Sequence, residues 1–177
     1  MFVAAQIGFI DEAFDENVYV LACVLDDAAG SCSPLRSLLL GKQQELKFGQ
    51  EGHARKLLLA QAYARLGLQA VIAVKESKGS NERRRGLCLV ALAWWVGDFV
   101  DSLVFDARQE RGNIHDRTVL KGLSGHGPKL TASFMPSQDV ETLWAADIVA
   151  GSMFHDVARG EPSYRHLLGD HHTLVEA

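Results

Sequence analysis

Residues 2–25, FVAAQIGFIDEAFDENVYVLACVL, determine the fold class of this chain. Residues 2–10 are apolar and almost free of polar side chains, as a strand buried on both faces would be. Residues 18–25 are rich in β-branched and aromatic side chains, which favours a second strand. The acidic segment 11–17 between them predicts a turn, so we expect the two strands to pair as a hairpin.

Helices and strands alternate along the rest of the sequence. Leu59, Ala62, Tyr63 and Leu66 fall at helical spacing, so residues 53–66 are expected to form a helix that ends at Gly67. Strands are predicted over residues 68–74, 102–105 and 129–134, and further helices over residues 82–100 and 140–157. Residues 35–40 and 45–48 fit either state. The order predicts an α/β fold, a mixed β-sheet flanked by helices.

Two segments of this pattern carry more specific expectations. The second half of the helix over residues 82–100 is apolar nearly all round, so we expect Trp94 and Trp95 to lie in the core. The whole chain, at 177 residues, has the length of one domain. We expect residues 1–160 to form that domain and residues 161–177 to be a frayed C-terminal tail.

Composition favours a soluble, cytoplasmic protein without a membrane anchor. The first basic residue is Arg36, whereas a secretory signal begins with a positive region. The longest apolar run, residues 87–96, is shorter than the roughly 20 residues that cross a bilayer. Three cysteines without a CxxC pair indicate reduced thiols that fill the core.

The charge distribution limits how the protein would bind nucleic acid. A net charge of −4 argues against nonspecific coating of nucleic acid, which needs many Lys and Arg contacts to phosphates. Residues 83–129 contain eight Lys and Arg against five Asp and Glu, a net charge of +3. Such a segment can steer a polyanion to one face, and an ordinary solvated surface explains it equally well.

Three aspartates occupy positions that favour a shared site. Asp11 and Asp106 each follow a predicted strand directly, and ligands of open α/β sheets bind outside the carboxyl ends of parallel strands. Each alone could also open a turn. Asp147 lies in the apolar stripe of the last helix, where an ionised carboxylate needs a compensating partner. A divalent cation shared by all three would compensate it, as would a salt bridge to Arg108 or an N–H hydrogen bond.

Four short segments carry a resemblance to a known family. They are IGFIDE at residues 7–12, ELK at 45–47, VFDAR at 104–108 and LWAADIVAG at 143–151. In order and spacing they resemble the signature blocks of the family called domain of unknown function 3800, and the last block is the most specific. The sequence departs from that pattern at Ala13 and Phe14, where the family has Ser-Gly, and at Phe48, where it has glycine.

This family is similar to RNase H-like nucleases, so the resemblance implies an RNase H-like mixed five-stranded sheet and a cluster of acidic metal ligands. Carried over to this sequence, the ligands and catalytic residues are Asp11, Glu45, Asp106 and Asp147. Mg²⁺ and Mn²⁺ prefer such oxygen ligands. Two ions about 4 Å apart could hold a scissile phosphate. The phosphate flanks could contact Lys47, Arg108 and Arg111.

Three functions are compatible with these features. The first is a divalent-metal-dependent phosphodiesterase, a nuclease that acts on DNA or RNA. The second is a non-catalytic RNase H-like module that binds nucleic acid or a protein partner, favoured by the altered residues Ala13, Phe14 and Phe48. The third is a structural partner protein whose acids form only salt bridges. His115 and Asp116 could act as acid or base, although a surface helix explains them more simply.

Overall fold

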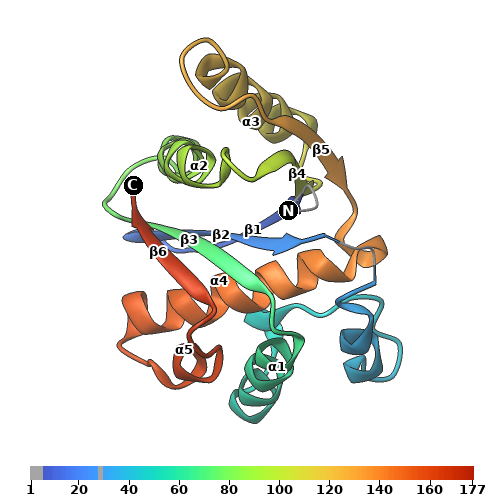
Figure 1. The fold of residues 1–177 in the computed structure, drawn as a ribbon. Coiled ribbons are helices and arrows are strands. Elements are labelled where there is room, and N and C mark those ends of the chain that lie inside the picture. The colour runs from blue at the N-terminus through green and yellow to red at the C-terminus, as the bar shows by residue number, and fades with distance from the viewer. Residues whose placement is uncertain (1–5, 28–29) are drawn as a thin grey trace.

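The computed structural model describes residues 6–27 and 30–177, and within them the chain forms a six-stranded mixed sheet with helices on both faces (Figure 1). The strands are β1 (Gln6–Phe14), β2 (Val18–Asp26), β3 (Gln69–Glu76), β4 (Val100–Asp106), β5 (Thr131–Met135) and β6 (His172–Glu176). The α-helices are α1 (His53–Leu66), α2 (Asn81–Val96), α3 (Glu110–Leu123), α4 (Glu141–Arg159) and α5 (Ser163–Leu167). Short 3₁₀ helices are η1 (Ser33–Leu38), η2 (Phe48–Gln50) and η3 (Ser137–Asp139).

The strands lie in the order β5-β4-β1-β2-β3-β6. β1, β2 and β3 form an antiparallel meander, so the predicted hairpin is confirmed. β4 and β5 extend the sheet from β1 in parallel, and β6 lies parallel to β3 at the other edge. The predicted α/β fold with a mixed sheet flanked by helices is therefore confirmed.

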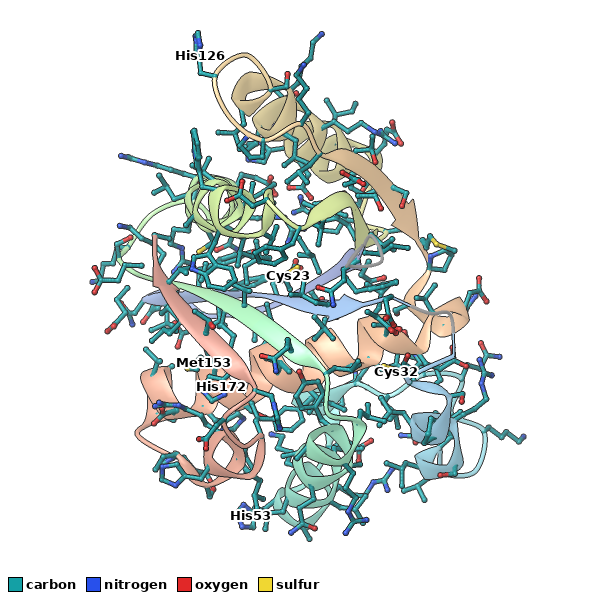
Figure 2. The ribbon with its side chains drawn as sticks, viewed as in Figure 1. Cys23, Cys32, His53, His126, Met153 and His172 are labelled. Atoms are coloured by element: carbon teal, nitrogen blue, oxygen red, sulfur yellow. The ribbon has the colours of Figure 1, made fainter. Side chains whose placement is uncertain are left out.

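The core has two layers because side chains alternate between the faces of a strand. Val20 and Ala22 of β2 face α1, α4 and α5, whereas Leu21 and Cys23 face α2 and α3. Figure 2 shows Cys23 on one side of the sheet and Met153 on the other. β2 is buried along its whole length, whereas β1, which was predicted to be buried on both faces, leaves Ile7 37% exposed. All three cysteines are free and buried.

The end of β1 differs from its prediction. The sequence places the strand end before Asp11, but β1 continues to Phe14, which pairs with Tyr19 of β2. The turn is shorter than predicted, and the Asp15 carboxylate accepts hydrogen bonds from the Asn17 and Val18 amides at 2.8 and 2.9 Å. Asp11 therefore lies inside a strand. Residues 2–5 of the predicted strand lie outside the described residues.

Local signals place most helix ends well. α1 has the predicted bounds, and Gly67 ends it in the left-handed conformation with φ of 67°. Ser80 caps α2 through its hydroxyl, which accepts a hydrogen bond from the Arg83 amide at 3.3 Å. The segments that fitted either state, residues 35–40 and 45–48, overlap the 3₁₀ helices η1 and η2. Short helices of this kind carry no clear hydrophobic period, so the sequence does not predict them.

The core position predicted for Trp94 and Trp95 is wrong. Their exposed fractions are 54% and 42%. α2 packs on the sheet through another stripe that includes Leu89 and Leu92, both fully buried. A Cβ at Gly127 would meet the Trp94 ring at 2.9 Å, so the loop after α3 lies against it. α2 thus carries apolar side chains outside the stripe that packs on the sheet.

The C-terminal residues are ordered parts of the fold, so the predicted frayed tail is wrong. α5 packs against α1 and α4, and Tyr164 and Leu168 are buried there. β6 pairs with β3 from Ala70 and His172 to Val74 and Glu176. Edge pairing of this kind depends on a distant strand and leaves little local signal. In the described part of the chain, none of the helices has the length and hydropathy needed to cross a bilayer.

Candidate metal centre

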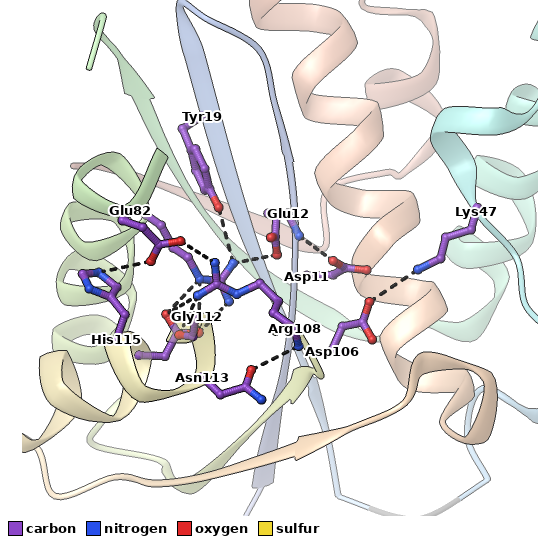
Figure 3. A network of polar contacts seen from close by, with 12 residues as sticks. Asp11, Glu12, Tyr19, Lys47, Glu82, Asp106, Arg108, Gly112, Asn113 and His115 are labelled. Atoms are coloured by element: carbon purple, nitrogen blue, oxygen red, sulfur yellow. Dashed lines mark hydrogen bonds and ion pairs between the residues drawn. The ribbon is translucent and has the colours of Figure 1, made fainter. Parts of the chain in front are cut away.

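Asp11 and Asp106 come together where two parallel strands stop pairing. The register of β1 and β4 ends with Ile10 opposite Phe105, and each aspartate is the next residue of its strand. Figure 3 shows the two carboxylates in the same region, with the Lys47 side chain reaching toward them from the facing segment. Asp11 is 7% exposed. The end of the β1–β4 pairing therefore places two carboxylates side by side, although β1 itself continues to Phe14.

α4 brings the third carboxylate, Asp147, and fixes the segment that carries Glu45. The Phe48 amide donates a hydrogen bond to Asp147 Oδ2 at 2.7 Å. One helical turn later, a Cβ at Gly151 would approach the Phe48 ring to 2.3 Å, so only glycine leaves room for that fully buried ring. Residues at i and i+4 share a helix face. The altered residue Phe48 thus anchors the Glu45 segment to α4.

Lys47 and Ser137 link the remaining carboxylates. Lys47 Nζ lies 3.4 Å from Asp106 Oδ2, 3.5 Å from Glu45 Oε2 and 3.2 Å from Ser137 Oγ. The Ser137 hydroxyl also donates to Glu45, and its amide donates to Asp106 Oδ1 at 3.1 Å. The Trp144 indole donates to the Ser137 carbonyl at 2.6 Å. Ser137 was not among the site residues predicted from the sequence, although it follows β5, the strand next to β4, which ends at Asp106.

All four predicted carboxylates act on the Lys47 ammonium. Burial lowers the pKa of Lys47, but Asp11, Asp106, Asp147 and Glu45 together raise it above its usual value. Glu45 and Asp106 contact Lys47 directly, and Asp11 and Asp147 act on its charge without a direct contact. They come from β1, the loop before η2, β4 and α4, segments far apart in the sequence.

The carboxylates hold more negative charge than Lys47 compensates. Burial raises the pKa of Asp11 well above its usual value, and the charges of Asp147 and Glu12 raise it further. Burial likewise raises the pKa of Asp147 to about 6, helped by Asp106 and Glu45 and opposed by the Phe48 amide and Lys47. In both residues the ionised form is disfavoured, so a further cation would be stabilised here.

The donor atoms of this site suit a hard cation, but they do not form a ready metal cage. Carboxylate and hydroxyl oxygens are the ligands that Mg²⁺ and Mn²⁺ prefer. Among the described residues, however, no three Asp, Glu, His or Cys side chains are arranged to hold a metal ion. The Lys47 ammonium lies between Glu45 and Asp106, where a cation would bind. Metal binding thus requires Lys47 to move aside.

The predicted phosphate contact Arg108 has other partners. Its guanidinium pairs with Glu82 at 2.9 Å and with Asp116 at 3.2 Å. The proposed salt bridge from Arg108 to Asp147 is therefore wrong, whereas the alternative N–H hydrogen bond to Asp147 is present. Arg111 lines a pocket of about 620 Å³ together with Arg108, and none of the four carboxylates lines it. Of the three predicted phosphate contacts, only Lys47 lies among the carboxylates.

Two arginines of the basic segment 83–129 are internal. Arg84 and Arg85 are only 2% and 1% exposed. Arg85 pairs with Glu12 at 2.6 Å and with Asp116 at 2.9 Å, and Asp116 has no exposed surface. A carboxylate held in this way is a structural ion partner, so Asp116 does not fit the acid or base role. Arg84, Arg85 and Arg108 therefore do not contribute to the predicted positive face.

The comparisons with known proteins add no relative. No family model matches this sequence, and no curated protein matches it. The resemblance to the domain of unknown function 3800 family therefore depends on the four short blocks. Three of those blocks contribute a carboxylate directly from β1, β4 or α4, and the fourth contributes Glu45 and Lys47.

The stability of the metal-free protein is expected to fall as Asp147 ionises. Its pKa in the folded protein is raised from 3.8 to about 6, first by burial. Because the folded state holds this proton more tightly than the unfolded chain, the stabilising contribution is complete below pH 3.8 and lost by about pH 6. Asp147→Asn keeps an acceptor for the Phe48 amide and removes the charge.

We therefore expect the melting temperature of Asp147→Asn, relative to wild type, to rise between about pH 4 and about pH 7 in EDTA. Thermal melts of both proteins across this range measure the difference. Asp139→Asn, an exposed change just before α4, is the control and should show no such trend. A difference between Asp147→Asn and wild type that does not change with pH would contradict the raised pKa.

Proposed function

We propose that the protein is a divalent-metal-dependent phosphodiesterase that cleaves DNA or RNA, with Asp11, Glu45, Asp106 and Asp147 as the ligands of Mg²⁺ or Mn²⁺. The observation that carries the proposal is that Lys47 contacts both Glu45 and Asp106, while Asp147 accepts from the neighbouring Phe48 amide and Asp11 lies at the end of the β1–β4 pairing. Partly buried like charges destabilise a fold, and such groups are concentrated at functional sites. A purely structural network would gain more from equal numbers of both charges.

The fold supports the same proposal. β1 to β5 make up a mixed five-stranded sheet of the kind that the RNase H-like resemblance implies, and β6 adds a strand beside β3. We infer that this is an RNase H-like domain. Asp11 and Asp106 lie where the parallel pair β1–β4 ends, the place where ligands of α/β sheets bind. α4 packs across β1 and β2 and brings Asp147 to that edge.

The residues of this site would share the chemical roles as follows. When bound, the metal supplies Lewis-acid stabilisation of a phosphate oxygen and a water of lowered pKa. Glu45 and Asp106 are held in position by Ser137, whose own carbonyl is fixed by Trp144. With Glu45 and Asp106 as metal ligands, Lys47, which contacts both, would be the residue placed to donate to a phosphate oxygen of the substrate.

Cleavage assays test this function. End-labelled single-stranded DNA, double-stranded DNA, single-stranded RNA and an RNA–DNA hybrid are incubated with Mn²⁺, Mg²⁺ or EDTA. We expect cleavage of at least one substrate with Mn²⁺ or Mg²⁺ and none in EDTA. Equal cleavage in EDTA would contradict the role of the metal, and no cleavage of any substrate would contradict the enzymatic activity.

One observation favours a second candidate, a non-catalytic binding module of the same fold. Lys47 already supplies a cation between Glu45 and Asp106, and the described residues contain no ready group of three metal ligands. In this candidate the carboxylates and Lys47 are a structural network, and the partner binds elsewhere. It predicts neither Mn²⁺ binding nor cleavage, so the two candidates differ in a direct measurement.

A further inference from the structure

A pocket of about 460 Å³ opens beside Asp147. It lies among the end of β1, η2, the start of α1 and the C-terminal half of α4. Its lining includes Phe14, Phe48, Lys56, Asp147, His155 and Arg159. Asp147, Gly151, His155 and Arg159 all line it, and their spacing of four residues puts them on one face of α4. We call it the α4 pocket.

Lys56 is the unusual residue of the α4 pocket. It is 9% exposed, and it forms no ion pair with any carboxylate of the described residues. Its Nζ lies 3.1 Å from His155 Nε2 and 5.5 Å from the centre of the Phe48 ring. A buried ammonium is costly unless an anion compensates it. Lys56 also lies near the N-terminus of α1, where the helix dipole disfavours a cation and favours an anion.

His155 orients Lys56 without neutralising it. A lysine ammonium can only donate, so His155 Nε2 must be unprotonated and accept from Lys56. The other ring nitrogen, Nδ1, then carries the proton and donates to Glu161 Oε2 at 3.2 Å. Burial and the charge of Lys56 lower the pKa of His155, which agrees with a neutral ring. The positive charge of Lys56 therefore stays available to a ligand.

Arg159 adds a second cation to the α4 pocket. It is exposed at the end of α4, where its guanidinium lies 5.6 Å from the centre of the Phe154 ring. Within the described part of the chain it forms no ion pair. Of the two acidic residues that line the pocket, Glu12 is neutralised by Arg85 at 2.6 Å, and Asp147 belongs to the candidate metal centre. The pocket thus adjoins the candidate metal centre and carries two cations, Lys56 and Arg159, for which the described residues show no ion pair.

We propose that the α4 pocket binds a phosphate group of the polynucleotide next to the scissile one. The proposal rests on the proposed function, because it assigns the pocket to the same substrate. Lys56 and Arg159 donate charge-assisted hydrogen bonds to the phosphate oxygens. Phe14 lies at the border of the pocket and is 45% exposed; one face of its ring stacks on Tyr19 at 5.1 Å, which leaves the other face for the adjoining base.

A binding experiment without metal separates this pocket from catalysis. Adenosine 5′-monophosphate, adenosine and inorganic phosphate are titrated by calorimetry into the full chain in EDTA at low salt. We expect the nucleotide to bind at least about tenfold more tightly than adenosine or free phosphate. In Lys56→Met, which keeps the aliphatic stem, affinity for the nucleotide should fall at least about tenfold.

Two variants control this experiment. Lys42→Met removes the same charge from an exposed position outside the pocket and should leave affinity unchanged. Asp11→Asn should keep nucleotide binding even though it is expected to lose cleavage, so failure of the pocket and failure of the proposed function are distinguishable. Because Lys56 is buried, Arg159→Gln, at an exposed position, gives a second test that does not depend on refolding the core.

Three results would overturn the proposal. One is no binding of the nucleotide to the wild-type chain. Another is that Arg159→Gln binds the nucleotide with wild-type affinity while Lys56→Met either does the same or fails to fold. The third is equal affinity for the nucleotide and inorganic phosphate, which would make the pocket a site for the free ion. Tighter binding of the nucleotide that falls in either variant supports the proposal.

Discussion

The Asp11→Asn variant is expected to lose at least about 100-fold of its Mn²⁺-dependent cleavage rate while remaining folded. Asn has nearly the same shape as Asp and keeps an oxygen that can accept the Glu12 amide at the position of Asp11 Oδ1, 2.8 Å away. It removes the negative charge that a divalent cation needs from its ligand. The same oligonucleotide assay, with both proteins at equal concentration, measures the loss.

Stability separates loss of chemistry from loss of folding in this variant. Burial, then Asp147 and Glu12, raise the pKa of Asp11, so ionised Asp11 destabilises the metal-free fold at neutral pH. The metal-free variant should therefore melt at a higher temperature than wild type. Asp101→Asn, an exposed change in β4, should alter neither property. Cleavage by Asp11→Asn at the wild-type rate would contradict the assignment of Asp11 as a ligand.

The Asp116→Ala variant is expected to lose about 3–5 kcal/mol of folding free energy. Asp116 is fully buried, and its carboxylate accepts hydrogen bonds from Arg85 Nε and Nη2, both at 2.9 Å, and from Arg108 at 3.2 Å. Removing it leaves Arg85, 1% exposed, with Glu12 as its remaining carboxylate. Figure 3 shows two members of this network, Glu12 and Arg108, close to Asp11. Breaking a buried pair from one side leaves an uncompensated charge.

Urea unfolding of Asp116→Ala and wild type measures this loss. Asp101→Ala, which removes an exposed carboxylate, is the matched control and should stay within about 0.5 kcal/mol of wild type. Because Arg85 also holds Glu12, the residue after Asp11, we expect the Asp116 variant to lower cleavage as well. A loss of stability below about 1 kcal/mol would show that the network is worth no more than a surface pair.

Local signals predicted the parts of the fold that depend on neighbouring residues. The bounds of α1 follow from an apolar stripe and Gly67, both readable within the helix. The extension of β1 through Asp11 and Glu12 follows from pairing with β2, which a polar segment does not reveal. β6 was missed for the same reason, because its partner β3 lies far away in the sequence.

In the candidate site, too, the sequence predicts the residues that a local pattern marks and misses those that only distant contacts bring together. Asp11 and Asp106 could be selected because each follows a run of buried strand residues, but their closeness requires β4 to lie beside β1. Asp147 could be selected from the helical period. Glu45 came only from the resemblance. Ser137, which holds both Glu45 and Asp106, lies 90 residues from Lys47, and no local pattern indicates that contact.

Buried charge was the hardest feature to predict. Arg85 and Asp116 are charged residues that usually lie at the surface, and each is buried here because the other compensates it. Lys56 is buried with no such carboxylate partner in the described residues, and its position in α1 gives no sequence signal. The burial of such charged groups can be recognised only from the three-dimensional structure, because it depends on segments far apart in the sequence.

Titration of Mn²⁺ into the metal-free protein measures whether these carboxylates form a metal site. We expect binding by calorimetry and a melting temperature that rises with Mn²⁺ concentration, because a ligand that binds only the folded state stabilises it. In Asp106→Asn, which keeps an acceptor for the Ser137 amide, affinity should fall at least about tenfold. A wild-type protein that neither binds Mn²⁺ nor gains stability from it would contradict the metal centre.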